Sequence, residues 1–530
     1  MINTKALREK VLDLAIRGKL VPQDPNDEPA SVLLKKIREQ KKQMVKEGKL
    51  KAKDIKKDTV IFKGDDNLHY EQFADGTVKC IEDEIPFEVP DGWAWCRLRN
   101  LFLVGSAKRV LKSEWKSNGI PFYRAREIVK LANDDYVNND LFISEEHYRN
   151  LKETYGVPAA GDLMVTGVGT IGKVYVVKEG DTFYYKDASV LCFENKYSGI
   201  VSEYAKLMID SPFLQSQIHT KTYGNTVDTI TITTAKEYLC ALPPAAEQQR
   251  IVDSVNNTIS LIDSLESNYQ DISAMTIILK SKVLDLAIRG KLVPQDQNDE
   301  PASILLERIR AEKEELIKAG KIKRDKKESV IFKGDDNSYY EKVGKNTNYI
   351  NEQIPFELPA SWCWCRLGNI FSHNTGKALN SSNTEGRLLT YITTSNLYWD
   401  RFELETLKEM LFTDSEIEKY TVKKGDLLVC EGGDIGRSAI WCYDDEMRIQ
   451  NHIHRLRPYV NLSNRFYYYV LWLWKQIGLI GGQGIGLQGF SSKAIHNLII
   501  PLPPLNEQNR ITHMIDELLG FLDTIEQHLS

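Results

Sequence analysis

The hydrophobic positions at the carboxyl end of the chain follow the spacing of a coiled-coil helix. They are separated alternately by four and three residues, which places them on one helical face. A segment in the middle of the chain has similar spacing and continues, with no proline, to about residue 292. We therefore predict a terminal helix and a central helix from about residue 247 to 292, the latter ~65 Å long. The apolar positions are Ile511, Ile515, Leu518, Leu522, Ile525 and Leu529 in the terminal helix, and Ile251, Val255, Ile259, Ile262, Leu265, Tyr269 and Ile272 in the central helix.

Between these helices the pattern changes to short strands. Alternating or aromatic-rich runs such as "WAWCRL", "VYVV", "DTITITT" and "SAIWCY" are bounded by turn residues. Short helical patterns, such as "SEEHYRNL" and "VSEYAKLMI", interrupt them. These segments predict α/β domains.

The chain is a tandem repeat, and its two halves have diverged unevenly. Residues 11–31 and 283–303 differ at one position, whereas residues 101–159 and 371–422 can scarcely be aligned. Such a pattern indicates that each half has a similar structural frame, formed by the repeated segments, and a divergent insert held by that frame. The two inserts would therefore present two different surfaces. The repeated landmarks, in the same order in both halves, are "VLDLAIRGKLVPQD" at Val11 and Val283, "VIFKGDDN" at Val60 and Val330, "IPFEVPDGWAWCRL" at Ile85 with "IPFELPASWCWCRL" at Ile354, and "LPPAAEQQRI" at Leu242 with "LPPLNEQNRI" at Leu502.

The order of the repeated segments predicts a circular organisation. In the central helix "EQQRI" precedes "VLDLAIRGKL", but the other copies of these two pieces lie at opposite ends of the chain. The second copy of this two-part helix is complete only if the N-terminal and C-terminal ends of the chain come together. We therefore predict an α+β fold in which two α/β domains are joined by two long antiparallel coiled-coil helices, with a pseudo-twofold internal repeat.

The predicted domain boundaries follow the landmarks. Residues 1–84 form an N-terminal frame helix with a lysine-rich arm, 85–244 the first α/β domain, 245–353 the central frame helix with a second arm, 354–504 the second α/β domain, and 505–530 the C-terminal frame helix. The arms, residues 35–57 and 308–327, are either solvated helical faces or segments that contact phosphate groups.

The composition limits the class of protein. Of 530 residues, 42% are hydrophobic and 27% are charged, which is typical of a globular protein with about two to four domains. The net charge of −5 lacks the basic excess that is common in nucleic-acid binders. The apolar runs fall short of the ~20 residues that span a bilayer, and the N-terminus does not resemble a secretory leader. We expect a cytoplasmic protein without a membrane segment.

Candidate catalytic motifs are few, and each has a structural interpretation. "GVGTIGKV" at Gly167 approaches a phosphate-binding loop, but Val174 offers no hydroxyl and the sister stretch "EGGDIGRS" differs at key positions, so we predict a strand-to-strand turn in both halves. The repeated Gly161-Asp162 and Gly425-Asp426 predict a turn in which the aspartate caps its own backbone rather than binds metal.

The cysteines and histidines give no clear metal or redox site. The eight cysteines are irregularly spaced, and Cys363 and Cys365 fit one face of a packed strand better than metal or redox chemistry. His452 and His454 would share a strand face, but the first half has neither histidine. No Asn/Asp-Pro-Pro-aromatic motif of an adenine methyltransferase is present. We therefore predict no catalytic and no metal-binding residue.

Taken together, the landmarks resemble the specificity subunit of type I restriction-modification systems over nearly the whole chain. The resemblance rests on "VLDLAIRGKLVPQ" in both halves, on "KGDLLVCEGGDIGRSAI" with its sister "AGDLMVTGVGTIGKVYV", on "GIPFYRAREI", and on the two junctions that start the helices. It implies that the α/β domains are target recognition domains, which bind a bipartite, asymmetric sequence in double-stranded DNA. The long lysine-rich arms are the main departure from the family.

The resemblance also implies partners. The helices would space the recognition domains and dock two modification subunits, which carry S-adenosylmethionine and methylate adenine. Restriction and translocase subunits would add chemistry that depends on ATP and Mg²⁺. This chain would hold no cofactor itself. Two other hypotheses are a non-catalytic scaffold with two protein-binding modules, and a nuclease or ATPase, against which the missing motifs argue.

Sequence recognition is expected in the divergent inserts. Basic, amide and aromatic side chains there can contact phosphates and base edges, although each residue taken singly fits an ordinary surface group better than a base reader. The candidates are Lys108, Arg109, Lys112, Lys116, Arg124, Arg126, Lys221, Tyr223 and Asn225 in the first insert, and Asn374, Lys377, Asn380, Arg387, Gln483, Gln488 and Lys493 in the second.

Overall fold

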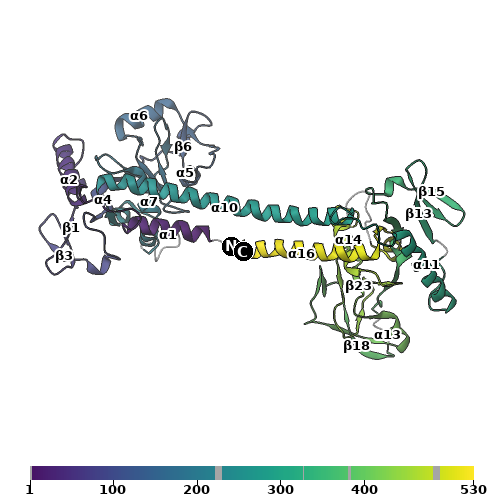
Figure 1. Ribbon diagram of the computed structural model, residues 1–530. Helices are drawn as coiled ribbons and strands as arrows, with labels where there is room; N and C mark the ends of the chain where they lie inside the picture. The colour runs from purple at the N-terminus through teal and green to yellow at the C-terminus, as the bar shows by residue number, and fades with distance from the viewer. Residues whose placement is uncertain (1–2, 221–228, 326–327, 380–383, 481–489, 530) are drawn as a thin grey trace. The chain divides into compact units, whose positions relative to one another are not determined.

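The chain folds into two units with the same succession of elements. The computed structural model describes residues 3–220, 229–325, 328–379, 384–480 and 490–529 (Figure 1). It divides into a first unit, Met1–Asn268, and a second unit, Tyr269–Ser530. The division falls inside the longest helix, α10 (Ala245–Ile288), which therefore belongs to both units. None of the described helices is long and apolar enough to cross a membrane.

In each unit two antiparallel helices form the frame. In the first unit α1 (Thr4–Ile16) lies along the beginning of α10, and Arg8 pairs with Asp263 and, at 3.1 Å, with Glu266. In the second unit α16 (Leu505–Leu529) lies along the end of α10, where Lys280 is 2.7 Å from both Asp523 and Glu526. The predicted α+β fold with long antiparallel helices is confirmed, while the meeting of the chain ends stays a prediction.

The frame contacts explain the near-identical segments that open each half. In both units a glycine with positive φ ends the first frame helix and lies against a proline, so closely that a Cβ would collide with it. A glutamine and an aspartate that follow then bind the first two turns of the second frame helix. These pairs are Gly18 with Pro90, Gln23 with Glu247 and Asp27 with Arg250, and correspondingly Gly290 with Pro359, Gln295 with Glu507 and Asp299 with Arg510.

The lysine-rich segments form a packed module in each unit instead of a free arm. The first module contains α2 (Ala30–Lys46), α3 (Ala52–Ile55), β1 (Val60–Lys63), β2 (His69–Gln72) and β3 (Val78–Cys80). The second contains α11 (Ala302–Lys318), β13 (Ser329–Lys333), β14 (Tyr339–Val343) and β15 (Asn346–Tyr349). In each module the strands form an antiparallel three-stranded sheet.

One buried lysine in each module anchors its helix. The Nζ atom of Lys41 lies 2.8 Å from Asp58, and that of Lys313 lies 3.1 Å from Glu328. Burial lowers the pKa of Lys41, partly offset by Asp58. The lysine count thus gave no hint that these helices are amphipathic, with Leu33 and Ile37 in the core.

The first insert is built on a four-stranded antiparallel sheet in the order β5-β11-β8-β9, beside a smaller sheet β10-β6-β7 and the frame pair β12-β4. Its elements are β4 (Ala94–Arg97), α4 (Leu98–Leu101), β5 (Leu103–Ser106), β6 (Ile120–Tyr123), α5 (Ala125–Ala132), β7 (Phe142–Ile143), α6 (Glu145–Tyr155), β8 (Leu163–Thr166), β9 (Val174–Val176), β10 (Tyr184–Tyr185), β11 (Val190–Glu194), α7 (Ser202–Asp210), α8 (Pro212–Thr220), α9 (Ile232–Lys236) and β12 (Leu239–Leu242).

The second insert repeats this topology, with the order β17-β26-β23-β24, a second sheet β21-β18-β25-β22 and the frame pair β16-β27. Its elements are β16 (Cys363–Arg366), α12 (Leu367–Ile370), β17 (Phe371–Thr375), β18 (Arg387–Ile392), β19 (Leu397–Tyr398), β20 (Arg401–Phe402), β21 (Lys408–Phe412), α13 (Asp414–Tyr420), β22 (Thr421–Val422), β23 (Leu427–Cys430), β24 (Ser438–Ile440), β25 (Met447–Ile449), β26 (Ile453–Pro458), α14 (Asn464–Gln476), α15 (Ser492–His496) and β27 (Ile499–Leu502).

The glycine-rich and Gly-Asp motifs are turns, as predicted. Residues 167–173 join the antiparallel strands β8 and β9, and Gly172 has a φ of +75°. Asp162 accepts hydrogen bonds from the backbone N–H groups of Ala159 and Asn195, both at 2.9 Å. Asp426 accepts one from Lys423 at 2.8 Å. Cys363 and Cys365 lie on β16, which confirms the packed strand.

Candidate nucleic-acid interface

Four of the predicted cations in the first unit extend from one loop. Lys108, Arg109, Lys112 and Lys116 lie between β5 and β6, and all four are exposed. The loop is fixed at its start, because the backbone N–H of Lys108 donates to the hydroxyl of buried Tyr184 at 3.0 Å. The side chains therefore extend into solvent from a backbone that the core holds in place, a suitable arrangement for contacting a polyanion.

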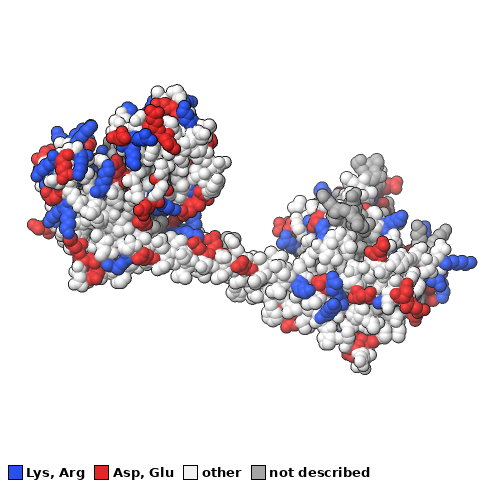
Figure 2. Space-filling view, turned by 90° about the horizontal axis from the view of Figure 1, so that it is seen from above, with Lys and Arg blue, Asp and Glu red and all other residues white. Residues whose placement is uncertain are grey.

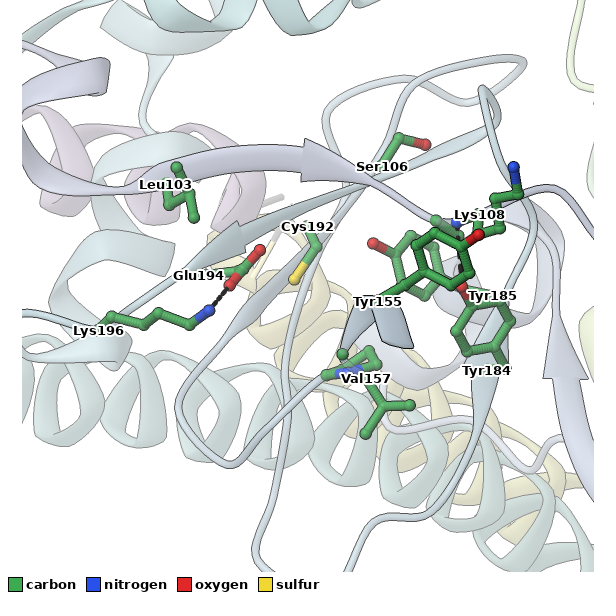
Figure 3. Close-up of a pocket in the computed structure, with 13 residues that line it drawn as sticks. Leu103, Ser106, Lys108, Tyr155, Val157, Tyr184, Tyr185, Cys192, Glu194 and Lys196 are labelled. Atoms are coloured by element: carbon green, nitrogen blue, oxygen red, sulfur yellow. Dashed lines mark hydrogen bonds and ion pairs between the residues drawn. The ribbon is translucent and has the colours of Figure 1, made fainter. Parts of the chain in front are cut away.

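A cavity of about 470 Å³ lies beside the start of this loop (Figure 3). Lys108 and Tyr155 meet at its edge, where the ammonium of Lys108 is 5.3 Å from the centre of the tyrosine ring. Tyr184, Tyr185 and Cys192 line it as well. Burial raises the pKa of the Cys192 thiol well above its usual value, so this cysteine is no nucleophile.

The arginines of the first insert are engaged with carboxylates. Arg124 lies 3.0 Å from Glu127, and Arg126 lies 2.7 Å from Asp140. Burial opposes ionisation of Glu127, but hydrogen bonds from the two arginines outweigh it and lower the pKa of this carboxyl. Arg124 is only partly exposed and closes the first turn of α5, whereas Arg126 is exposed. To bind a partner, Arg126 would have to exchange its ion pair with Asp140 for the new contact.

Among the described candidates of the second unit, only Lys493 is an exposed cation that forms no ion pair within the described residues. Lys377 is buried, with its Nζ 2.7 Å from the carbonyl oxygen of Leu411 and 2.6 Å from Glu416, so it holds the domain together. Arg387 is exposed and 2.9 Å from Asp414. Asn374 donates to the backbone carbonyl of Lys419 at 2.6 Å. Lys493 is exposed in the first turn of α15.

The remaining candidates lie outside the described residues. They are Lys221, Tyr223, Asn225, Asn380, Gln483 and Gln488. Residues 221–228 follow α8, and residues 481–489 separate Ile480 from Phe490.

A pair of histidines next to Phe490 was missed by sequence reasoning: His454 is fully buried and His373 is partly exposed. The Nε2 of His454 is 2.6 Å from the carbonyl oxygen of Phe490, and its Nδ1 is 2.9 Å from the Nε2 of His373. Because a carbonyl only accepts, Nε2 of His454 carries a proton, and the neutral ring accepts at Nδ1 from His373. The pair links β17 and β26 to Phe490. His452, with which His454 was grouped from the sequence, lies in a turn before β26.

The histidine pair predicts an acid sensitivity of the second unit. Burial, with the neighbouring His454, lowers the pKa of His373 to about 3, and burial lowers that of His454 too. A depressed histidine pKa means that the unfolded chain takes up protons first, so stability is complete above about pH 6.5 and falls as the pH drops towards 3. At pH 5.5 we expect His373 to contribute a loss of about 1 kcal/mol, allowing for its partial exposure.

The measurement is the thermal unfolding of wild type and His373→Gln at pH 7.5 and pH 5.5. A glutamine amide can still donate to His454 but does not titrate, so the acid-induced loss should be smaller in the variant. Equal losses in the two proteins would contradict this assignment.

Charges of both signs are mixed on the face that Figure 2 shows. On the face shown in Figure 2, Lys and Arg are interspersed with Asp and Glu in each unit and form no continuous basic stripe. Among the described residues, no group of three or more His, Cys, Asp or Glu side chains could hold a metal ion. The arrangement offers positioned donors and cations on surface loops, which suit recognition of an anionic partner.

The comparisons with known proteins agree with this description. The family model "Type I restriction modification DNA specificity domain" matches residues 90–273 and 359–530, one stretch for each insert with the frame helix that follows it. The lysine-rich modules lie outside both stretches. The chain is 28% identical to the type I restriction enzyme EcoAI specificity subunit of Escherichia coli, over 97% of this chain and 89% of that protein.

Two further proteins are similar. The EcoEI specificity subunit of Escherichia coli is also 28% identical, over 84% of this chain and 75% of that protein. The crystal structure of the HsdS subunit from Thermoanaerobacter tengcongensis has a TM-score of 0.54 with 17% identity, over 84% of this chain and 94% of that one. This last likeness shows the fold.

Proposed function

The chain belongs to the family of type I restriction-modification DNA specificity subunits, and from this premise we propose that it reads a bipartite, asymmetric DNA sequence, one part with each unit. As a specificity subunit it is not itself catalytic. The observation that carries the proposal is the pair of inserts. Their four-stranded sheets have the same strand order, yet their loops present different side chains. The two units can therefore bind different base sequences with the same fold.

In the first unit, the exposed cations of the β5–β6 loop would make the first contacts with DNA. Lys108, Arg109, Lys112 and Lys116 can reach phosphates or guanine edges without breaking an ion pair in the described structure, whereas Arg124 would have to leave Glu127. In the second unit the corresponding role falls to Lys493, and to Arg387 once it leaves Asp414. We include the candidates at 221–225, 380 and 483–488 in the proposed interface on sequence alone.

The frame helices would dock two modification subunits. Each unit contains its own copy of "VLDLAIRGKL", and exposed apolar side chains on the frame helices suit protein contacts, among them Leu261 in the first unit and Ile278 and Phe521 in the second. The modification subunits would carry S-adenosylmethionine, and restriction subunits would bring ATP and Mg²⁺ chemistry. Such a complex would act in the cytoplasm, where bacterial DNA lies.

Methylome sequencing tests the proposal. Cells that express this chain with the modification subunit of its system should acquire methyl-adenine at one sequence composed of two short specified parts and an unspecified spacer. Two independent readers joined by a frame produce such a gap, because bases between the contacted half-sites are not read. A single continuous motif would contradict the proposal, as would no new methylation from an active modification subunit.

A further inference from the structure

Leu111 is an exposed apolar residue in the cationic loop between β5 and β6. Its side chain is 53% exposed, and among the described residues of the first insert it is the only leucine, isoleucine or valine that is exposed. Exposed cations lie on both sides of it in the sequence, Arg109 before it and Lys112 directly after it. The loop that would first contact DNA thus presents one apolar side chain among its positive charges.

The backbone of the loop holds Leu111 in a fixed place. Val110, directly before it, is 5% exposed and belongs to the core of the insert. The backbone N–H of Leu111 donates to the carboxylate of Glu114 at 2.6 Å, and that of Lys116 donates to the carbonyl oxygen of Phe142 at 2.8 Å. The leucine is therefore positioned outside the core before any partner binds.

The second insert also has an exposed leucine in the corresponding loop. Leu379 is 65% exposed and lies shortly after β17, which has the same place in its sheet as β5. The hydroxyl oxygen of Thr375, at the end of β17, is 2.8 Å from that of Ser492. This contact brings α15, with the exposed Lys493, beside the start of the loop. In both inserts an exposed leucine therefore accompanies candidate DNA-binding cations.

An exposed tyrosine of the first insert has the opposite surroundings. Tyr136 is 86% exposed in the loop between α5 and β7, and its sequence neighbours include Asp134, Asp135 and Asp140. Carboxylates repel phosphate groups, so this loop is unsuited to DNA, whereas the cations around Leu111 attract the backbone of the duplex. Charge therefore distinguishes Leu111 from an exposed apolar side chain that has no part in DNA binding.

We propose that Leu111 in the first unit and Leu379 in the second insert at a base-pair step of the half-site that each unit reads, and so kink the DNA. Leucine is among the side chains that unstack a step in this way and bend a duplex by about 20–90°. A residue that read one base should differ between two units that read different sequences, whereas an inserted leucine acts on the deformability of a step. The exposed leucine in both loops therefore favours insertion over contact with a thymine methyl group. This inference rests on the proposed function.

A bending measurement on the whole complex tests the proposal. The full-length chain with its modification subunits is mixed with a duplex that contains the target found by methylome sequencing and carries a dye at each end. Leu111→Ala should lower the energy transfer between the dyes and weaken binding about tenfold, because the burial of most of the leucine side chain is lost. Leu111→Met should bend and bind DNA like wild type, since methionine can also be inserted.

Two further variants complete the measurement. Tyr136→Ala removes another exposed apolar side chain of the same insert and should change neither bending nor binding. Leu379→Ala should remove a separate part of the bend, and the double variant with Leu111→Ala should lose the sum of the two parts. Because both leucines are exposed, these substitutions leave the cores of the inserts intact.

The outcomes separate insertion from the wider function. An unbent duplex in the wild-type complex, or a full bend with Leu111→Ala, would overturn the proposal and leave the proposed function intact. The same holds if Leu111→Ala relaxes the choice of one base pair without a change in bend, which is the result expected of a thymine contact. Loss of the bend with Leu111→Met would also overturn it. A wild-type complex that recognises no bipartite sequence would contradict both the insertion and the proposed function.

Discussion

Replacement of residues 103–237 by the corresponding insert of another specificity subunit will abolish methylation at the original target and change one of its two half-sequences only. This exchange leaves β4 and β12 in place, so the frame pairing from Ala94 opposite Leu242 to Arg97 opposite Leu239 survives. Each mismatched base pair costs about 1–3 kcal/mol of binding, so several misread positions should reduce occupancy of the old target by roughly a thousandfold or more.

Methylome sequencing of cells that express the chimaera with its modification subunit gives the new target directly. The matched control exchanges residues 371–497, which should alter the other half-sequence and preserve the first. If either exchange altered both half-sequences, the two units would not read DNA independently.

Glu71→Gln will strongly destabilise the first unit. Glu71 is 3% exposed and lies between two arginines, with Arg97 at 2.7 Å and Arg99 at 3.0 Å, and it accepts a 2.6 Å hydrogen bond from Thr59. Burial alone would raise the pKa of the Glu71 carboxyl, but hydrogen bonds from Arg97 and Thr59 outweigh burial, so the net pKa is lowered. Neutralising the carboxylate leaves the two buried guanidinium groups with only the partly exposed Glu84 and Glu237 as carboxylate partners, for which a loss of about 3 kcal/mol is expected.

The second unit supplies the control for this substitution. Glu341 corresponds to Glu71 but pairs with one arginine, Arg366, at 2.8 Å, and both side chains are more exposed than those of the first unit. Glu341→Gln should therefore lower the free energy of unfolding by less, about 1–2 kcal/mol. Hydrogen exchange of β2 and β14 under native conditions reports each unit separately. Equal effects of the two substitutions would mean that the second arginine adds nothing.

The periodicity of the sequence predicted the frame well, because coiled-coil spacing is a local property. Ile251, Val255, Ile511 and Ile515 are fully buried, as the pattern requires. The same pattern continues through Leu265, which is 51% exposed. The spacing therefore predicts the helix and its apolar face. Whether each apolar side chain is buried depends on which other elements pack against it, and the local sequence does not contain that information.

The inserts show the opposite limit of sequence reasoning. Their sequences can scarcely be aligned, yet β5-β11-β8-β9 and β17-β26-β23-β24 have one order, because a sheet needs alternation and register more than particular residues. The candidate site was harder to predict. Lys377 looked like a surface cation, but Glu416, 39 residues later in the chain, holds it in the interior. His373 and His454 are separated by 81 positions, and no local signal joins them.

The frame contacts have a consequence for how the chain tolerates change. Gln23 binds Glu247 within the first unit, and Gln295 binds Glu507 within the second, so each unit closes on itself. We therefore expect each unit to unfold as its own cooperative unit, even though α10 runs through both, so that destabilisation of one insert need not spread to the other. A lineage can thus alter one half of its DNA target while the stability of the other reader stays as it was. Independent folding of the two units would thus allow new DNA specificities to evolve one unit at a time.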